Sequence, residues 1–170
     1  SYLLGYWQSE KYFSGYEMEI RSQFQFSPIL DKKNAELAKK IMGELSVALH
    51  VRRGDYVGHI THSQVHNVDL TMYYQLALTH VQKAIKGATF YLFSDDPSWA
   101  VENLRLPKNT TVVNHNLHAN SFRDMHLMSL CKHHVTANST FSWWGSWLSQ
   151  SESKVVICPK QWFTAQGLRL

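Results

Sequence analysis

Short apolar runs alternate with helical patterns along most of this chain. Strands are predicted at residues 45–51, 89–93, 110–113, 134–137 and 154–158. Helices are predicted at residues 28–43, 69–86, 97–103, 121–131 and 140–150. This order favours a parallel sheet with helices on both faces. We therefore predict an α/β, Rossmann-like domain, in which ligands bind at the carboxyl ends of the strands.

Local capping signals mark several of the predicted helix starts. Ser27 and Pro28 fit an N-cap and a first helical residue, and Asp96 fits an N-cap ahead of the next proline. Ser121 and Asp124 fit a capping box, which would make Asp124 a structural residue.

Aromatic residues are concentrated at the two ends of the chain. Residues 1–26 form no self-contained pattern, so we predict a connecting segment that packs against another part of the protein, with the domain proper at residues 27–170. Near the other end, Trp143, Trp144 and Trp147 have helical spacing, which favours a core stripe over a sugar-binding platform.

The charge balance favours an anionic partner. The chain has 17 Lys and Arg against 13 Asp and Glu, a net charge of +4. The lysines are scattered, so no basic stripe indicates nucleic-acid binding. Two cysteines, Cys131 and Cys158, are too few for a disulfide framework or a zinc site.

Targeting signals are not evident in the sequence. No apolar run reaches the roughly 18 residues of a membrane span, and residues 1–7 lack the basic region and cleavage site of a signal peptide. We expect a cytoplasmic protein, with peripheral contact with the inner membrane face left open. Since the chain does not begin with Met, we expect it to start inside a longer protein.

Two adjacent arginines, Arg52 and Arg53, follow the strand at residues 45–51. Guanidinium groups bind phosphate oxygens in pairs of hydrogen bonds, so this pair suits a diphosphate. Because neighbouring residues of a strand point to opposite faces, one arginine would contact the ligand and the other would hold the loop, pairing with Asp55. The alternative is a surface salt bridge.

Carboxylates follow the next strand, in the order Ser94, Asp95, Asp96 and Pro97. Capping by Asp96 would leave Asp95 for a ligand. A metal site and recognition of a nucleoside are both compatible with this pair. We favour the nucleoside, because the arginines already supply positive charge.

Polar groups also surround the start of the helix at residues 140–150. Asn138, Ser139, Thr140 and Ser142 would place hydroxyls and backbone N–H groups at its N-terminus, an arrangement that binds anions. Alternatively, Ser139 or Thr140 is only the N-cap. A further alternative, metal binding by the loop histidines His59, His62 and His66, is not favoured, since they have no cysteine or carboxylate nearby.

Taken together, these motifs resemble a known family. H-V-R-R-G-D-Y-V at residues 50–57 resembles the first motif of the alpha-1,2-fucosyltransferases of glycosyltransferase family 11, and S-D-D-P at residues 94–97 resembles their nucleotide-side motif. Residues 123–131 and 138–148 are similar to the closing motif of bacterial members. The resemblance implies a GT-B fold, of which this chain would supply mainly the domain that binds GDP-fucose.

The resemblance also implies site residues. It assigns diphosphate binding to Arg52, supported by Arg53, and guanosine contacts to His50 and the Asp95/Asp96 pair. With the phosphate-binding turn included, the expected donor-binding set is His50, Arg52, Arg53, Ser94, Asp95, Asp96, Asp124, Asn138, Ser139, Thr140 and Ser142. The expected catalytic residues are Arg52, Arg53 and Asp55.

The reaction implied is a metal-independent, inverting transfer of fucose from GDP-fucose to a galactose 2-hydroxyl of an oligosaccharide or lipid-linked glycan. Asp55, His62 and His66 are candidates for the base. The glycine-rich turn expected near the start of family members does not occur here, so we expect the acceptor half to be missing and the chain alone to be inactive. A GDP-sugar-binding module without turnover is the alternative.

Overall fold

The computed structural model describes residues 4–53 and 68–163, which contain a parallel five-stranded sheet in the order β3-β2-β1-β4-β5. The strands are β1 (Ser46–Val51), β2 (Thr89–Ser94), β3 (Thr110–Val113), β4 (His133–Val135) and β5 (Val156–Ile157). The short runs predicted as strands form neighbouring strands of one sheet, and the predicted Rossmann-like α/β arrangement is confirmed.

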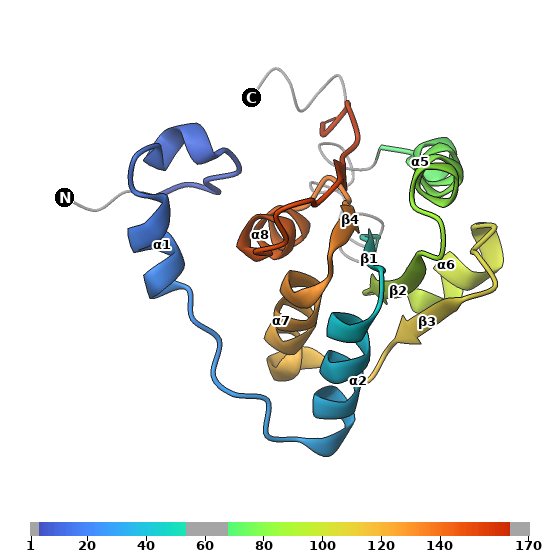
Figure 1. Cartoon of the computed structure of the whole chain (residues 1–170). Helices are drawn as coiled ribbons and strands as arrows, with labels where there is room; N and C mark the ends of the chain where they lie inside the picture. The colour runs from blue at the N-terminus through green and yellow to red at the C-terminus, as the bar shows by residue number, and fades with distance from the viewer. Residues whose placement is uncertain (1–3, 54–67, 164–170) are drawn as a thin grey trace.

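Helices cover both faces of the sheet (Figure 1). One face packs on α5 (Thr71–Ala84) and α6 (Pro97–Asn103), and the other packs on α2 (Lys32–Gly43) and α7 (Phe122–Leu130). The alternation of side chains along β1 explains the two cores. Val47 and Leu49 lie in the core beneath α5, whereas Ala48 lies in the core beneath α2 and α7.

The last long helix, α8 (Thr140–Leu148), packs closely on α7. Gly145 allows this approach, because a Cβ atom built there would lie 2.9 Å from Cε and 3.2 Å from Cβ of Met128. The Cβ atom of Met128 is fixed to its helix backbone and cannot move aside. Helix α8, whose N-terminus borders the sheet edge, therefore depends on a glycine for its position.

Gly145→Ala is expected to lower the free energy of unfolding by about 1–2 kcal/mol, because overpacking against Met128 outweighs the gain in helix propensity. Urea denaturation measures the change. Gly43→Ala is the matched control, since its Cβ would meet nothing within 4 Å; it should be neutral or stabilising. Equal stability of the two variants would contradict this account of the α7–α8 contact.

The N-terminal segment packs on the outer side of α8 (Figure 1). It contains the short helices η1 (Glu10–Phe13) and α1 (Glu17–Gln23). The ring of Phe13 stacks on Trp144 at 5.9 Å between centroids and meets Trp147 edge-on at 5.1 Å. The prediction that the α8 tryptophans are core residues is confirmed for Trp147, which is buried. It is wrong for Trp143 and Trp144, which are only partly buried and contact the N-terminal segment.

Several predicted boundaries differ from the structure. The helix predicted from Pro28 begins at Lys32, because the Asp31 carboxylate accepts the Asn34 N–H at 2.9 Å and caps it. Helix α5 ends at Ala84, and β4 and β5 are shorter than the predicted strands at residues 134–137 and 154–158.

A short 3-10 helix, η2 (His118–Asn120), precedes α7. Among the described residues, no helix has both the length and the apolar character needed to cross a bilayer.

Candidate functional site

The sheet has a switch point beside β1. The chain runs from β1 to β2 and β3 on one side and then returns to the other side as β4 and β5. In parallel sheets, ligands bind at the carboxyl ends of the strands where the order reverses in this way. Here those ends are the residues after Val51 and after Val135.

Four charged residues at the ends of β1 and β2 form a cluster that we call the strand-end cluster: Arg52, Arg53, Asp95 and Asp96. The register pairs Val51 with Ser94, so the two arginines lie opposite the two carboxylates. Arg52 Nη1 is 3.3 Å from Asp95 Oδ2, and Arg53 Nε is 3.6 Å from Asp96 Oδ2. The backbone N–H of Arg53 donates to Asp95 Oδ1 at 2.9 Å.

The two arginines have different surroundings, as predicted from their opposite directions. The Arg53 guanidinium lies 4.0 Å from the centroid of the Trp99 ring on α6. Its partner Asp96 caps α6 by accepting the Trp99 N–H at 3.1 Å, which confirms the predicted cap. Arg53 therefore supports the loop, but among the described residues it does so through Asp96. Asp55, the predicted partner, lies outside them.

Asp95 already has two partners in the structure, and its predicted contact with a ligand stays a prediction. One oxygen accepts the backbone N–H of Arg53 and the other pairs with Arg52. Asp95 thus orients the Arg52 guanidinium, whose side chain is 31% exposed. The hydroxyl of Ser94, just before it, accepts the Asp96 N–H at 3.0 Å.

His50 lies on the same face of β1 as Arg52, two residues earlier. Its ring is fully buried and lies 5.5 Å from the Phe141 ring of α8. Burial, with a smaller effect of the Arg52 charge, lowers the pKa of His50 to about 3, so the imidazole is neutral. Among the described residues, no group hydrogen-bonds its buried Nδ1 atom, and a buried polar atom of this kind calls for an explanation, such as a bound water or ligand.

The turn from β4 into α8 faces β1 across the switch point. Ser139 occupies the N-cap position as predicted but makes no side-chain cap hydrogen bond. Ser142 is fully buried, and its hydroxyl accepts the Ala137 N–H at 2.9 Å. Asn138 donates to the Trp162 carbonyl at 2.9 Å, and Thr140 accepts from Gln8. Ser142 and Thr140 therefore support the turn through hydrogen bonds of their side chains, and Ser139 contributes its backbone at the N-cap position.

Asp124 does not complete a capping box with Ser121, contrary to the prediction. Ser121 makes no cap hydrogen bond, and Asp124 Oδ1 instead accepts from Asn116 Nδ2 at 2.8 Å. Burial raises the pKa of Asp124 to about 6, opposed by the hydrogen bond from Asn116. A carboxyl group whose pKa is raised in this way is a candidate ligand-binding group.

Sequence reasoning missed two polar residues behind Asp124, namely Asn34 and Asn116. Both side chains are buried, and their amides are hydrogen-bonded to each other. A signal for the first was present: Asn34 shares the buried stripe of α2 with Ala38 and Ile41. A polar residue on an apolar helix face needs a partner, and that partner could have been sought.

The candidate bases Asp55, His62 and His66 lie outside the described residues, as does His59. Within residues 4–53 and 68–163, no group of three or more His, Cys, Asp or Glu side chains could hold a metal ion.

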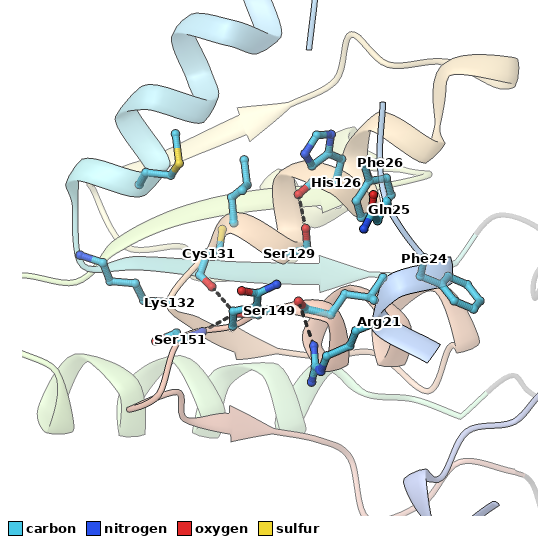
Figure 2. Close-up of a pocket in the computed structure, with 14 residues that line it drawn as sticks. Arg21, Phe24, Gln25, Phe26, His126, Ser129, Cys131, Lys132, Ser149 and Ser151 are labelled. Carbon is cyan, nitrogen blue, oxygen red and sulfur yellow. Dashed lines mark hydrogen bonds between the residues drawn. The ribbon is translucent and has the colours of Figure 1, made fainter. Parts of the chain in front are cut away.

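A pocket of about 710 Å³ is lined by described residues outside the strand-end cluster, and Figure 2 shows its walls. Cys131 and Lys132 line it just before β4, which places it at the amino edge of the sheet. Its other walls include Phe24 and Phe26 of the N-terminal segment and Ser149 after α8. Of the predicted site residues that the structure describes, none lines this pocket.

The parallel sheet, with its switch point beside β1 and helices on both faces, places the chain in the class of Rossmann-like α/β domains. More specifically, the chain belongs to glycosyl transferase family 11, whose family model matches residues 1–168.

Named relatives agree with this family. The chain is 34% identical over 171 residues to the alpha-1,2-colitosyltransferase of Escherichia coli, a match covering 97% of this chain and 57% of that protein. It is also 34% identical over 169 residues to the O-antigen biosynthesis glycosyltransferase WbnK of Escherichia coli, covering 97% and 56%. The galactoside 2-alpha-L-fucosyltransferase of Caenorhabditis elegans is 27% identical over 162 residues, covering 88% and 43%. The chain thus spans about half the length of these relatives.

Proposed function

We propose that this chain is the donor-binding part of an alpha-1,2-fucosyltransferase of the GT-B type. The complete enzyme would transfer fucose from GDP-fucose to a galactose 2-hydroxyl of an oligosaccharide or lipid-linked glycan, with inversion and without a metal. One observation carries the proposal: Arg52, held by Asp95, lies beside the neutral His50 at the switch point, opposite the N-terminus of α8.

The chemistry requires stabilisation of a leaving group. When the bond between fucose and the β-phosphate breaks, negative charge grows on the phosphate oxygens. The guanidinium of Arg52 and the backbone N–H groups at the start of α8 would stabilise that charge. Arg53 would act indirectly, since its contacts with Asp96 and Trp99 fix the loop that carries Arg52.

His50 and Asp124 would contact the nucleoside. The imidazole of His50 is neutral and its Nδ1 atom has no partner in the described part of the chain, so it suits hydrogen bonding to an uncharged group. Asp124 contributes an acceptor at the same edge of the sheet. The proton of the acceptor hydroxyl would pass to a base, for which Asp55, His62 and His66 stay candidates.

Two alternatives follow from specific observations. Since the chain spans 57% of the relative named as an alpha-1,2-colitosyltransferase, at 34% identity, colitose is the second candidate for the transferred sugar. A GDP-sugar-binding module without turnover is the alternative to an enzyme, since the candidate donor residues at the switch point require only binding.

Calorimetry of the chain with GDP, GDP-fucose, GDP-mannose and ADP, without divalent metal, tests the proposal. We expect GDP and GDP-fucose to bind at least tenfold more tightly than ADP, because the site would recognise guanosine as well as phosphate. GDP-mannose tests selection of the sugar. A folded sample that binds neither GDP nor GDP-fucose would refute a donor site built from this chain.

A further inference from the structure

A buried hydrogen-bonded chain connects three elements at the carboxyl edge of the sheet. Asn34 comes from α2, Asn116 from the loop after β3, and Asp124 from the first turn of α7. The two asparagines are only 2% and 6% exposed. Burying two amides in this way is unfavourable unless their hydrogen bonds are satisfied.

The two amides satisfy each other. Asn34 Nδ2 donates to Asn116 Oδ1 at 2.8 Å, and Asn116 Nδ2 donates back to Asn34 Oδ1 at 3.0 Å. The second proton of Asn116 goes to Asp124 Oδ1 at 2.8 Å, and that of Asn34 goes to Asp31 Oδ2 at 3.1 Å. His115 Nε2 lies 2.9 Å from Asn34 Oδ1.

This pattern fixes the orientation of the Asn116 amide. Rotating it by half a turn would bring its oxygen against the Asp124 carboxylate and its N–H groups against Asn34 Nδ2. Both contacts would be repulsive, so only one orientation is stable. Asn34 thereby determines which group Asn116 presents to Asp124.

Burial has the larger effect on the pKa of Asp124 and raises it, while the hydrogen bond from Asn116 lowers it and holds the carboxylate in position. The adjacent cation Arg123 pairs with Asp31, and His115, which has Lys33 as a charged neighbour, contacts Asn34. Within the described part of the chain, Asn116 donates the one hydrogen bond that Asp124 receives, and it goes to Oδ1. One oxygen is thus anchored and the other can face a ligand.

We propose that the Asn34–Asn116 amide pair is a positioning device for Asp124, which holds Oδ1 so that Oδ2 is presented to the donor. The donor-binding role of Asp124 rests on the proposed function, but the control of Asp124 by the amide pair does not. Asn116 acts directly on the carboxylate, and Asn34 acts through Asn116.

Carbon-13 NMR titration of the Asp124 carboxyl group tests the positioning directly, with Asp124→Asn used to assign the resonance. In Asn116→Leu the titration midpoint should rise by about one pH unit, because the ionised form loses a hydrogen bond. Asn34→Leu should shift it in the same direction by less. Asn103→Leu, an exposed asparagine at the end of α6, is the matched control and should shift nothing.

Calorimetry with GDP at pH 7 tests the link to the donor. Asn116→Leu should weaken binding by about tenfold. If Asn34 acts through Asn116, the Asn34→Leu/Asn116→Leu double variant should bind no more weakly than Asn116→Leu alone. Near-UV circular dichroism checks folding, and Asn116→Ser replaces Asn116→Leu if the larger change prevents folding.

An unchanged Asp124 midpoint in a folded Asn116 variant would overturn the proposal, as would additive losses in the double variant. A shifted midpoint in a chain that does not bind GDP would refute the donor site while supporting the positioning. The two failures are therefore distinguishable.

Discussion

Arg52→Ala is expected to weaken GDP binding to this chain by about 100-fold. A guanidinium that contacts a diphosphate makes charge-assisted hydrogen bonds, and losing a pair of them costs about 3 kcal/mol. Calorimetry with GDP measures the loss. Arg52→Lys should recover only part of it, because an ammonium group cannot form the paired contact.

Two controls separate binding from folding. Arg105→Ala removes an exposed arginine at the opposite edge of the sheet, between α6 and β3, and should leave GDP affinity unchanged. Asp95→Asn in the Arg52→Ala background removes the carboxylate that would otherwise lose its ion-pair partner. If Arg52→Ala binds GDP as tightly as Arg105→Ala does, Arg52 is not a phosphate ligand and the proposed site is wrong.

Arg53→Ala should behave differently from Arg52→Ala. The Arg53 guanidinium lies over Trp99 and beside Asp96, so its removal should mainly lower the stability of the loop and of α6. The alternation of side chains along a strand predicts that the two arginines have different roles. It does not predict that Asp96 is the partner of Arg53, because the register that brings them together exists only once β1 and β2 pair.

Long-range contacts account for the failed local predictions. Ser121 and Asp124 have the spacing of a capping box, but Asn116 and the burial of α7 against α2 draw the carboxylate away. Ser27 and Pro28 are as good a helix start as Asp31 by local criteria. Asp31 is used because Asn34 and Arg123, both in contact with it, tie it to the rest of the domain.

The tryptophans of α8 show a second limit of local sequence patterns. Their helical spacing correctly predicts one apolar face, but spacing cannot say what covers it. The cover is the N-terminal segment, through Phe13 and Phe24, more than 100 residues away in sequence. The strands, by contrast, were predictable because a buried parallel strand is a continuous apolar run, whatever its neighbours are.

The second large effect expected is that Asp124→Asn makes the chain more stable while it weakens GDP binding. In the fold the pKa of Asp124 is raised from 3.8 to about 6 by burial. Keeping this carboxylate ionised at pH 7.5 therefore costs about 2–3 kcal/mol of folding free energy, which the neutral asparagine avoids. Urea denaturation at pH 7.5 should show an increase of that size.

The pH dependence gives a second readout. Between pH 4 and pH 6 the folded chain keeps a proton on Asp124 that the unfolded chain has already lost. The contribution of Asp124 to the free energy of unfolding must therefore fall as pH rises through this window. Asp124→Asn should remove that slope. Asp31→Asn is the contrasting variant: hydrogen bonds from Asn34 lower the pKa of Asp31, so its removal should destabilise the fold at neutral pH.

A gain in stability coupled to a loss of affinity is the signature of a residue retained for binding rather than for folding. GDP affinity of the wild-type chain should fall as pH drops below 6, when Asp124 becomes protonated, and Asp124→Asn should bind at least tenfold more weakly at pH 7.5 with no such pH dependence. A destabilised Asp124→Asn would instead make the carboxylate a structural partner of Asn116. If Asp124→Asn is stabilised but binds GDP as tightly as the wild-type chain does, the Asp124 carboxylate has no role in binding the donor.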